Sequence, residues 1–422
     1  MNISSAIKIK IICRNQNIFT AIMYNRTIAL YKNAYSGLTR RMWLLAVVML
    51  INRCGTMVLP FMALYCIHRG YSDIQSGMAV AVYGIGSVVG AFLGGKFSDR
   101  FGFYRVQFIS LFGGGIMFML LGRMDSYLSI CICIFFASMI NESFRPANAS
   151  AIAHYSTPEN RTQSFSIVRL AINLGWGVGS ALAGILSHIS YKLLFWVDGS
   201  TNIAAAIVLL LILPAVSLAQ QKQQTNLAKD VKISGPYKDK TYLIFIGFTI
   251  LFAFCFFQLF TTVPLFFKKA LQLDELHIGI IMSMNGILIA CFEMIIVFKL
   301  EGTTAYLRLM TIGAIIMAIA YFTLNIPLNN GFFVALISVV VITVGEIIGM
   351  PFMNSYYISR TNAANRGQYA AVFTMAWSIA QVIGSLSGTQ IVHHLGFQTL
   401  WWIIGGICFI TAFGFNYIYS KR

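Results

Sequence analysis

The chain has 422 residues and a formal net charge of +17, and 58% of its residues are hydrophobic while only 10% are charged. Its mean hydropathy of +0.75 leaves too few polar side chains to cover the surface of a water-soluble protein. The composition therefore indicates an integral membrane protein and excludes a soluble globular one. An anionic membrane leaflet is sufficient to explain the positive charge, so we expect no nucleic-acid partner.

Apolar stretches of about 20 residues, the length with which a helix crosses a bilayer, recur along the chain. The first six are 43–66, 75–95, 106–122, 128–152, 164–188 and 193–214. The second six are 242–264, 276–298, 307–324, 331–357, 368–391 and 398–419. We therefore predict an all-α, polytopic membrane protein with twelve transmembrane helices.

Two polar segments divide the chain. Residues 1–41 are basic and contain no apolar core followed by a cleavage site, so we predict a cytoplasmic tail without a signal peptide, and Met23 is an alternative start to Met1. Residues 216–240 predict a flexible cytoplasmic linker. The linker separates an N-terminal six-helix bundle, 42–215, from a C-terminal six-helix bundle, 241–422.

The distribution of Lys and Arg predicts the orientation. Of the 30 basic residues, 22 fall on the side of the N-terminus, five on the opposite side and three inside spans. Basic residues concentrate on the cytoplasmic side of membrane proteins. We therefore expect both termini in the cytoplasm and, for a bacterial protein, location in the cytoplasmic membrane.

The two halves repeat one another. At an offset of 205 residues, ten positions from Pro146 to Trp196 meet identical residues from Pro351 to Trp401. At an offset of 202, Asp99 meets Glu301. Two parallel six-helix repeats are an architecture that transporters use for alternating access, so we predict two pseudo-symmetric bundles.

The run from Gly95 to Arg105 is a short charged turn between two apolar spans. It reads Gly95-x3-Asp99-Arg100-x-Gly102 and ends with Arg105, and a turn this charged cannot lie in hydrocarbon. The pattern resembles the loop 2–3 signature of the major facilitator superfamily of transporters, and the chain as a whole is most similar to its twelve-span drug:proton antiporters.

This resemblance implies a cytoplasmic gate formed by Gly95, Asp99, Arg100, Gly102 and Arg105. Glycine at the first position permits close helix approach, and Asp99 is expected to face the amide-rich start of span 11, which carries partial positive charge. In the family, the equivalent residues latch the two halves together and stabilise the outward-facing state. The alternative is that the two arginines only anchor the loop at the membrane surface.

Span 5 carries Gly175-x3-Gly179-Ser180-x2-Ala183-Gly184. This resembles the glycine-rich motif of the proton-driven drug exporters, although its proline and one of its glycines are replaced here. Small residues at this spacing also allow helix backbones to touch in any membrane bundle. An antiporter role and simple packing are both open at this point.

Ionisable side chains inside spans are costly and are functional candidates. They are the acids Glu142, Asp198, Glu293 and Glu346 and the bases Arg53, Arg145 and Arg169. Asp198 and Arg169 lie about one turn from the ends of their predicted helices, so we expect structural or interfacial roles for them. Glu293 is intermediate, and the other four lie near mid-membrane.

Glu346 has no base on its own helix, whereas Glu142 and Arg145 are three residues apart on one helical face. An acid at bilayer depth without a local partner suits a reversible proton carrier. We predict Glu346 first and Glu142 second as proton-coupling residues, with Arg53 and Arg145 as charge partners. For Glu142 and Arg145, a salt bridge that holds Pro146 in place is the alternative.

Polar and aromatic residues at matching depth are candidates for the substrate cavity. They are Asn52, Tyr65, Gln258, Asn285, Asn354, Tyr357, Trp377 and Gln381. Each of them alone also suits helix packing. Many aromatic side chains with few fixed charges suit an amphipathic, even cationic guest, and they equally suit lipid-facing belts.

The resemblance implies secondary active transport of a small organic solute by alternating access, and we favour proton-coupled efflux by antiport. A proton-coupled importer of small peptides or metabolites is the alternative, because Arg53 before Pro60, together with Glu142 and Arg145, is faintly similar to peptide:proton symporters. A remoter alternative is a non-transporting sensor.

The chain contains no nucleophile–base set, no phosphate-binding loop and no set of residues at metal-ligand spacing. Seven of the eight cysteines fall inside predicted spans, where they behave as small apolar residues. We therefore expect no enzymatic activity, no cofactor and no metal site. The expected partners are the lipid bilayer, a small-molecule substrate and protons, with the protein as a monomer.

Overall fold

The computed structural model describes residues 29–216, 235–326, 330–362 and 365–421, and all regular elements in these ranges are helices. Residues 1–28 of the predicted tail and 217–234 of the predicted linker lie outside the described residues. The domain boundaries drawn through these two segments therefore stay predictions.

The described helices of the first half, here called the N-half, follow a short helix, Ala29–Tyr35. They are α2 (Arg40–Cys54), α3 (Val58–His68), α4 (Asp73–Phe101), α5 (Phe103–Leu121), α6 (Tyr127–Glu142), α7 (Phe144–Tyr155), α8 (Arg161–Ile189) and α9 (Tyr191–Ile212).

The second half, the C-half, contains seven described helices of different lengths. They are α11 (Lys240–Phe257), the 3-10 turn η1 (Gln258–Phe260), α12 (Thr262–Lys269), α13 (Glu275–Leu300), α14 (Tyr306–Thr323), α15 (Gly331–Ser359) and α16 (Arg366–Ser420).

These elements form the twelve predicted spans because several spans are broken or joined. Span 4 is made of α6 and α7, and span 7 of α11, η1 and α12; each is long and apolar enough to cross a membrane once. Predicted span 1 covers α2 and α3. The 55-residue α16 is two helices, because Gly396 has a positive φ of 79° that interrupts the helical path. Broken helices at membrane depth are tolerated where the freed backbone is buried in protein.

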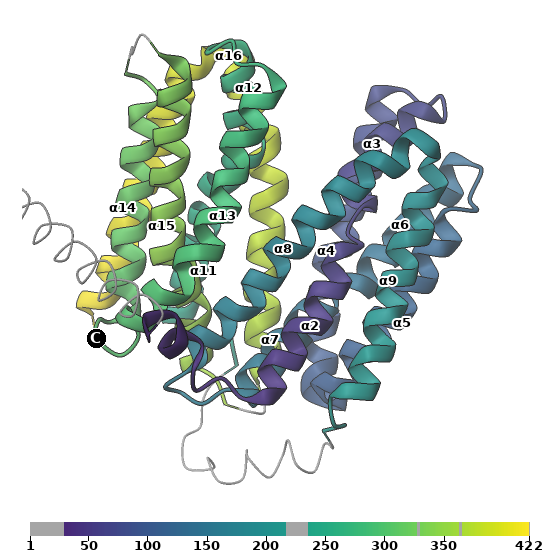
Figure 1. Cartoon of the computed structure of the whole chain (residues 1–422), viewed down its shortest axis with the longest axis horizontal. Coiled ribbons are helices and arrows are strands. Elements are labelled where there is room, and N and C mark those ends of the chain that lie inside the picture. The colour runs from purple at the N-terminus through teal and green to yellow at the C-terminus, as the bar shows by residue number, and fades with distance from the viewer. Residues whose placement is uncertain (1–28, 217–234, 327–329, 363–364, 422) are drawn as a thin grey trace, which may run out of the picture.

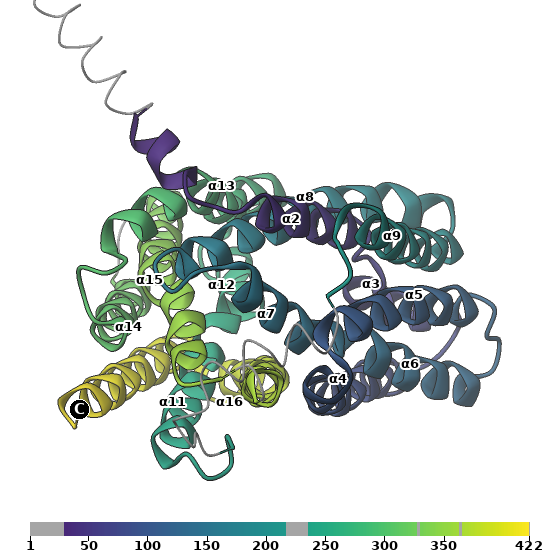
Figure 2. The same cartoon turned by 90° about the horizontal axis from the view of Figure 1, so that it is seen from below.

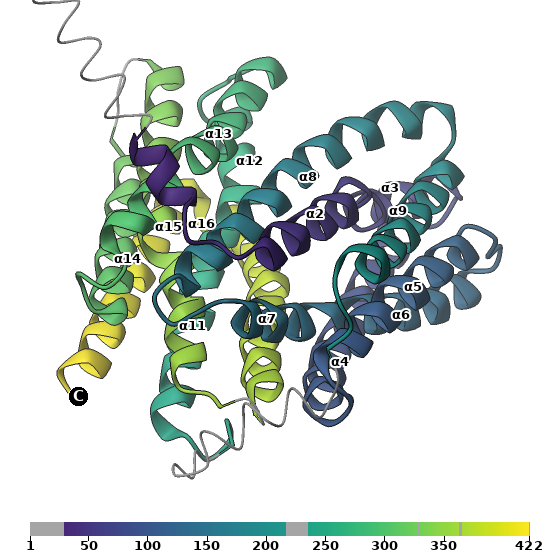
Figure 3. The same ribbon diagram turned by 60° about the horizontal axis from the view of Figure 1, so that its bottom comes forward.

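The two halves lie side by side and form two helical bundles (Figure 1). They approach one another at the lower end of the view, which we call the closed end, and diverge at the upper, open end (Figure 1). Seen from below, α16 lies beside α4, and α8 lies beside α13 (Figure 2). Both the start of α2 and the end marked C lie at the closed end (Figures 1 and 3).

Glycines set how closely several helices approach. A Cβ atom on Gly115 of α5 would lie 2.6 Å from the carbonyl oxygen of Gly199 on α9, and one on Gly313 of α14 would lie 2.6 Å from that of Gly345 on α15. Such separations are shorter than any ordinary carbon–oxygen contact. Within lipid, where burial of apolar surface gives little drive to associate, this close packing is what holds neighbouring helices together.

A polar clamp ties three helices of the C-half together at the closed end. Asp239 begins α11, and its carboxylate accepts hydrogen bonds from Arg360 Nε at 2.9 Å and Arg360 Nη2 at 2.8 Å. The Tyr242 amide and the Tyr369 hydroxyl donate to the same carboxylate at 3.0 and 3.2 Å. Burial raises the pKa of Asp239, but the bonds from Arg360 and Tyr242 outweigh it, so this pKa lies below its usual range.

Replacement of Asp239 by asparagine is expected to lower the free energy of unfolding in detergent by about 1–3 kcal/mol, because charged hydrogen bonds are lost. A carboxylate with a depressed pKa stabilises the fold above its unfolded pKa of about 4 and stops doing so as the pH falls through its folded pKa. The difference in melting temperature between wild type and Asp239→Asn should therefore be full at neutral pH and shrink in acid.

Asp125→Asn is the matched control. Asp125 pairs with Arg69, but its side chain is 78% exposed, so this pair contributes little. Equal losses of melting temperature in the two variants, or a loss in Asp239→Asn that does not depend on pH, would contradict the role of the clamp.

Candidate functional site

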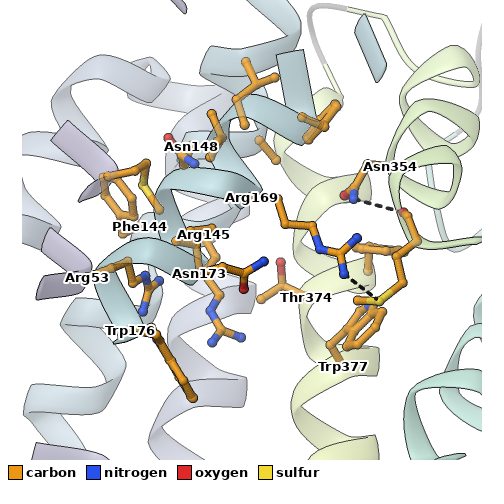
Figure 4. Close-up of a pocket in the computed structure, with 18 of the residues that line it drawn as sticks. Arg53, Phe144, Arg145, Asn148, Arg169, Asn173, Trp176, Asn354, Thr374 and Trp377 are labelled. Atoms are coloured by element: carbon orange, nitrogen blue, oxygen red, sulfur yellow. Dashed lines mark hydrogen bonds between the residues drawn. The ribbon is translucent and has the colours of Figure 1, made fainter. Parts of the chain in front are cut away.

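A cavity of about 340 Å³ lies between the two halves (Figure 4). The N-half contributes α2, α7 and α8 to its wall, and the C-half contributes α11, η1, α13, α15 and α16. Its polar and charged lining residues are Arg53, Arg145, Asn148, Arg169, Asn173, Asn285, Glu346, Asn354, Tyr357 and Thr374. Both halves thus share one central chamber whose volume suits a small organic molecule.

At the border of this cavity, one arginine of the N-half is shared by two acids of the C-half. Arg169 on α8 donates from Nη1 to Glu293 Oε2 on α13 at 2.8 Å, and from Nη2 to Glu346 Oε1 on α15. Asn285 Nδ2 donates to the other oxygen of Glu346 at 2.8 Å. Both glutamates are 2% exposed. We call Arg169, Glu293 and Glu346 the inter-half cluster.

A second charged group lies within the N-half. Arg145 Nε pairs with Glu142 Oε2 at 2.8 Å, and Tyr83 donates its hydroxyl to Glu142 Oε1 at 3.3 Å. Arg53 is also buried here, and among the described residues its Nε has no hydrogen-bond partner. A small cavity of about 20 Å³ lies among these side chains, enough for about one water molecule.

Arg53 is positioned by the glycines of span 5 and by the break in span 1. A Cβ on Gly175 would lie 2.6 Å from Arg53 Cβ, and one on Gly179 would lie 3.0 Å from the Cys54 carbonyl oxygen. The glycine spacing therefore packs α8 against the last turn of α2. This contact supports the packing interpretation of the span 5 motif, and it also places Arg53 at the cavity wall.

Asp198 holds the break between α2 and α3. Its Oδ2 accepts hydrogen bonds from the Met57 and Val58 amides at 3.2 and 3.1 Å, and its Oδ1 accepts one from Asn202 Nδ2 at 2.9 Å. Asn202 in turn accepts from Asn52 Nδ2 at 2.8 Å. The structure thus gives Asp198 a structural contact, but it buries the side chain instead of placing it at the membrane surface.

The structure pairs both predicted coupling acids with bases, but only one of the two pairs is a predicted one. Glu142 does pair with Arg145. Glu346, however, is paired with Arg169, and not with Arg53 or Arg145. The pairing is corrected because α8 crosses to the C-half at this depth, which brings Arg169 rather than the bases of α2 and α7 within reach of α15.

Four of the predicted cavity residues do line the chamber: Asn285, Asn354, Tyr357 and Trp377. The other four lie outside its lining. Asn52 is bonded to Asn202, Tyr65 packs edge-on against Phe195 at 4.8 Å, and Gln258 donates to the Gly384 carbonyl at 2.9 Å. Gln381 on α16 is partly exposed. For these four the cavity prediction is corrected, and for the first three the reason is that their side chains are engaged in contacts inside one half.

Arg169 and Glu293 are among the ionisable candidates from the sequence, but sequence reasoning gives them no place in the site. The predicted span 5 begins at residue 164, which puts Arg169 about one turn from the membrane surface. In the structure α8 begins at Arg161, about two turns before Arg169. One available signal was the balance of charge, since acids near mid-membrane in the C-half require bases at the same depth.

At the closed end, Asp99 accepts hydrogen bonds from the backbone amides of Gly367 and Gln368 at 2.8 and 3.0 Å. These amides begin α16, so the carboxylate lies at the helix N-terminus, as predicted. A Cβ on Gly95 would lie 2.4 Å from the Gly367 carbonyl oxygen, which explains glycine there. Arg100 stacks over Phe101 at 5.2 Å, and it is exposed, as is Arg105. Gly102, with φ of 92°, makes the turn between α4 and α5.

Glu301 repeats this contact on the other side of the pseudo-symmetry axis. Its Oε1 accepts a hydrogen bond from the Thr162 amide at 2.9 Å, near the start of α8. Thr162 and Gly367 are 205 residues apart, the offset of the sequence repeat. Burial raises the pKa of Glu301, although the bonds from Thr162 and the charge of Arg161 partly offset it. The closed end is thus held by two symmetry-related carboxylate–helix contacts.

Comparison with known proteins assigns the chain to a family. The sequence model of the Major Facilitator Superfamily matches residues 43–385. A Na(+), Li(+), K(+)/H(+) antiporter of Planococcus maritimus is 24% identical over 88% of this chain and 94% of its own length. The class D tetracycline resistance protein of Salmonella ordonez is 24% identical over 74% of this chain and 78% of its own.

Among solved structures, a bacterial homologue of the iron transporter ferroportin in its outward-facing state superimposes with a TM-score of 0.71. The two sequences are 15% identical, and the match covers 91% of this chain and 100% of that one. This likeness shows the fold. The chain therefore belongs to the Major Facilitator Superfamily and is a multi-pass membrane transporter, not an enzyme.

Proposed function

We propose that this transporter moves a small organic solute by alternating access and couples the movement to protons at the inter-half cluster. The observation that supports the proposal most is that Arg169 of one half is shared by two buried carboxylates of the other, at the wall of the central cavity. A contact between the halves that changes with protonation is what coupling requires.

The charge of the cluster explains how a proton would act. With both acids ionised, two carboxylates and one guanidinium carry a net charge of −1 in a buried environment, where an uncompensated charge is costly. Uptake of one proton makes the cluster neutral and leaves Arg169 held by a single carboxylate. If Glu346 takes the proton, the contact between α8 and α15 would weaken, and loss of the proton would restore it.

Alternating access requires the halves to separate at the closed end. The carboxylate of Asp99 and that of Glu301 would then leave the starts of α16 and α8. We propose that the closed end faces the cytoplasm of a bacterial cell, because 22 of the 30 basic residues lie on its side in the predicted topology, and because several relatives are bacterial.

Export in exchange for protons is the direction that we propose first. Relatives whose names describe a function include a cation/proton antiporter, two tetracycline resistance proteins and a multidrug resistance protein. Resistance by a membrane transporter is commonly efflux. Each of these relatives is less than 25% identical to this chain, so they support a direction of transport but do not identify the substrate.

Proton-coupled uptake is the second candidate, and the sign of the charges at the cavity favours it. Among the described residues that line the chamber, three are arginines and one, Glu346, is an acid. A negatively charged solute and a proton would each favour binding of the other, so they would travel together. A cationic solute would compete with the proton, which is the condition for exchange.

Proteoliposomes with an acidic lumen and an enclosed pH-sensitive dye test coupling and direction together. Tetracycline, sodium chloride or an aromatic carboxylate is added outside. Exchange predicts that the lumen becomes more alkaline, and co-transport predicts that it becomes more acidic.

Glu346→Gln should reduce either signal by about tenfold or more, because a buried ion pair worth several kcal/mol no longer responds to protons. Glu159→Gln, in an exposed loop, serves as the control.

A Glu346→Gln protein whose solute-driven proton signal equals that of wild type would overturn the coupling role. If none of these solutes moves protons in wild type while one of them is transported, proton coupling itself is wrong.

The two carboxylate–helix contacts give a separate prediction. Asp99→Asn and Glu301→Gln should each favour opening of the closed end and slow the transport cycle without preventing membrane insertion. Ser98, which is 1% exposed beside Asp99, provides a reporter. In Ser98→Cys protein, maleimide labelling should rise about tenfold when either acid is replaced, since each carboxylate–amide hydrogen bond contributes about 1.5–3 kcal/mol. Asp125→Asn should leave the labelling rate unchanged, and unchanged rates in all three would contradict the latch.

A further inference from the structure

We propose that the central cavity recognises an organic anion, with the guanidinium of Arg145 as the anchor for its acidic group and aromatic side chains around its apolar body. The inference rests on the proposed transport function of this cavity. If the solute is an anion, it favours the second candidate, proton-coupled uptake, but the binding test below measures neither proton movement nor direction.

The acids of the site are placed so that the arginines face the chamber. Glu142 and Glu293 lie outside the lining of the large cavity, behind Arg145 and Arg169 respectively. Arg169 uses both of its terminal nitrogens for Glu293 and Glu346. Of the other two arginines of the lining, Arg145 is the more accessible, because its side chain is 37% exposed while Arg53 is 9% exposed.

The geometry of Arg145 suits an anion anchor. Its ion pair with Glu142 uses Nε, and Glu142 is 5% exposed while the Arg145 side chain is 37% exposed. The pair therefore fixes the side chain through Nε, and among the described residues Nη1 and Nη2 of Arg145 make no ion pair, while the residue lines the cavity (Figure 4). Two parallel N–H donors on a guanidinium match the two oxygens of a carboxylate or phosphate.

Two further groups reinforce the anchor. Arg53 lies in the wall of both cavities together with Arg145, so it adds a second positive charge close by. Asn173 lines the same wall, and among the described residues its Nδ2 is buried without a hydrogen-bond partner. A buried donor without a partner is costly unless a guest or a water molecule accepts from it.

The apolar part of the chamber suits a planar body. Trp176, which is 39% exposed, extends from α8 near Arg145, and Trp377 lies across the chamber on α16 (Figure 4). Phe256 packs edge-on against Trp377 at 5.6 Å. Indole rings offer large faces for stacking at small entropic cost. A cationic guest would find the same rings, but it would meet the field of Arg53 and Arg145.

The charge of the lining therefore changes the expectation drawn from composition. Aromatic content alone suited an amphipathic cation, whereas the arrangement of the arginines favours an anion of similar shape. An aromatic carboxylate is the simplest member of this class.

Three probes with one shared body test the inference on purified full-length protein: naphthalene-2-carboxylate, its neutral carboxamide and naphthalen-2-ylmethylammonium. Quenching of tryptophan fluorescence and thermal stabilisation report binding. The carboxylate should bind at least about tenfold more tightly than the amide, because a charged, bidentate hydrogen-bond pair is lost in the amide. The ammonium probe should bind more weakly than either.

Arg145→Gln should weaken binding of the carboxylate by about tenfold or more and leave the amide unchanged. Arg145→Lys should retain part of the preference. Arg145→Gln leaves the buried Glu142 without its ion-pair partner, which can destabilise the fold. The double variant Glu142→Gln/Arg145→Gln removes both charges, so a loss of binding in it is not caused by an unpaired Glu142. Arg308→Gln, an exposed arginine over the Tyr419 ring, is the control.

The inference would be overturned if the three probes bound equally or the ammonium probe bound most tightly. It would also be overturned if Arg145→Gln and Glu142→Gln/Arg145→Gln both kept the full preference for the carboxylate. None of these results bears on Glu346, whose proton coupling is measured separately in proteoliposomes. Conversely, a carboxylate preference that depends on Arg145 would stand even if no proton movement were found.

Discussion

The structure depends on one buried interaction, the sharing of Arg169 between Glu293 and Glu346. Among the described residues, it joins charged side chains of the two halves, and both of its carboxylates are buried, so water compensates their charge poorly. Charges at this depth persist only when they are paired, and here the partners belong to different bundles. In the proposed mechanism, the pairing stabilises one arrangement of the halves, and a change in its protonation would alter the balance between arrangements.

Other contacts are arranged around this interaction at two depths. At the closed end, Asp99 and Glu301 bind the starts of α16 and α8, so the same two helices that form the latch also carry the cavity wall. Deeper in the membrane, Asp198 and the glycines of α8 fix the break in span 1 and hold Arg53 beside the chamber. The contacts of Asp198 and of these glycines lie within the N-half, whereas the inter-half cluster and the contacts of Asp99 and Glu301 join the two halves.

Sequence reasoning predicted the twelve spans, the repeat and the contact of Asp99 with the start of span 11, because each of these follows from local hydropathy, spacing or helix electrostatics. It did not predict that Arg169 meets Glu346. Depth along a helix can be estimated from sequence, but the direction in which a tilted helix crosses to the other half cannot. For the same reason, the sequence predicts Tyr65 and Gln258 to line the cavity, whereas in the structure each side chain contacts a residue of its own half.

The central claim is that the carboxylates around Arg169 exchange protons within the functional pH range. Infrared difference spectroscopy between acidic and alkaline protein measures carboxyl protonation directly. We expect a carbonyl band of protonated carboxyl to appear on acidification in wild type, to be reduced in Glu346→Gln and to be reduced further in Glu293→Gln/Glu346→Gln. A band that is identical in all three proteins would contradict it, because the protons would then bind elsewhere.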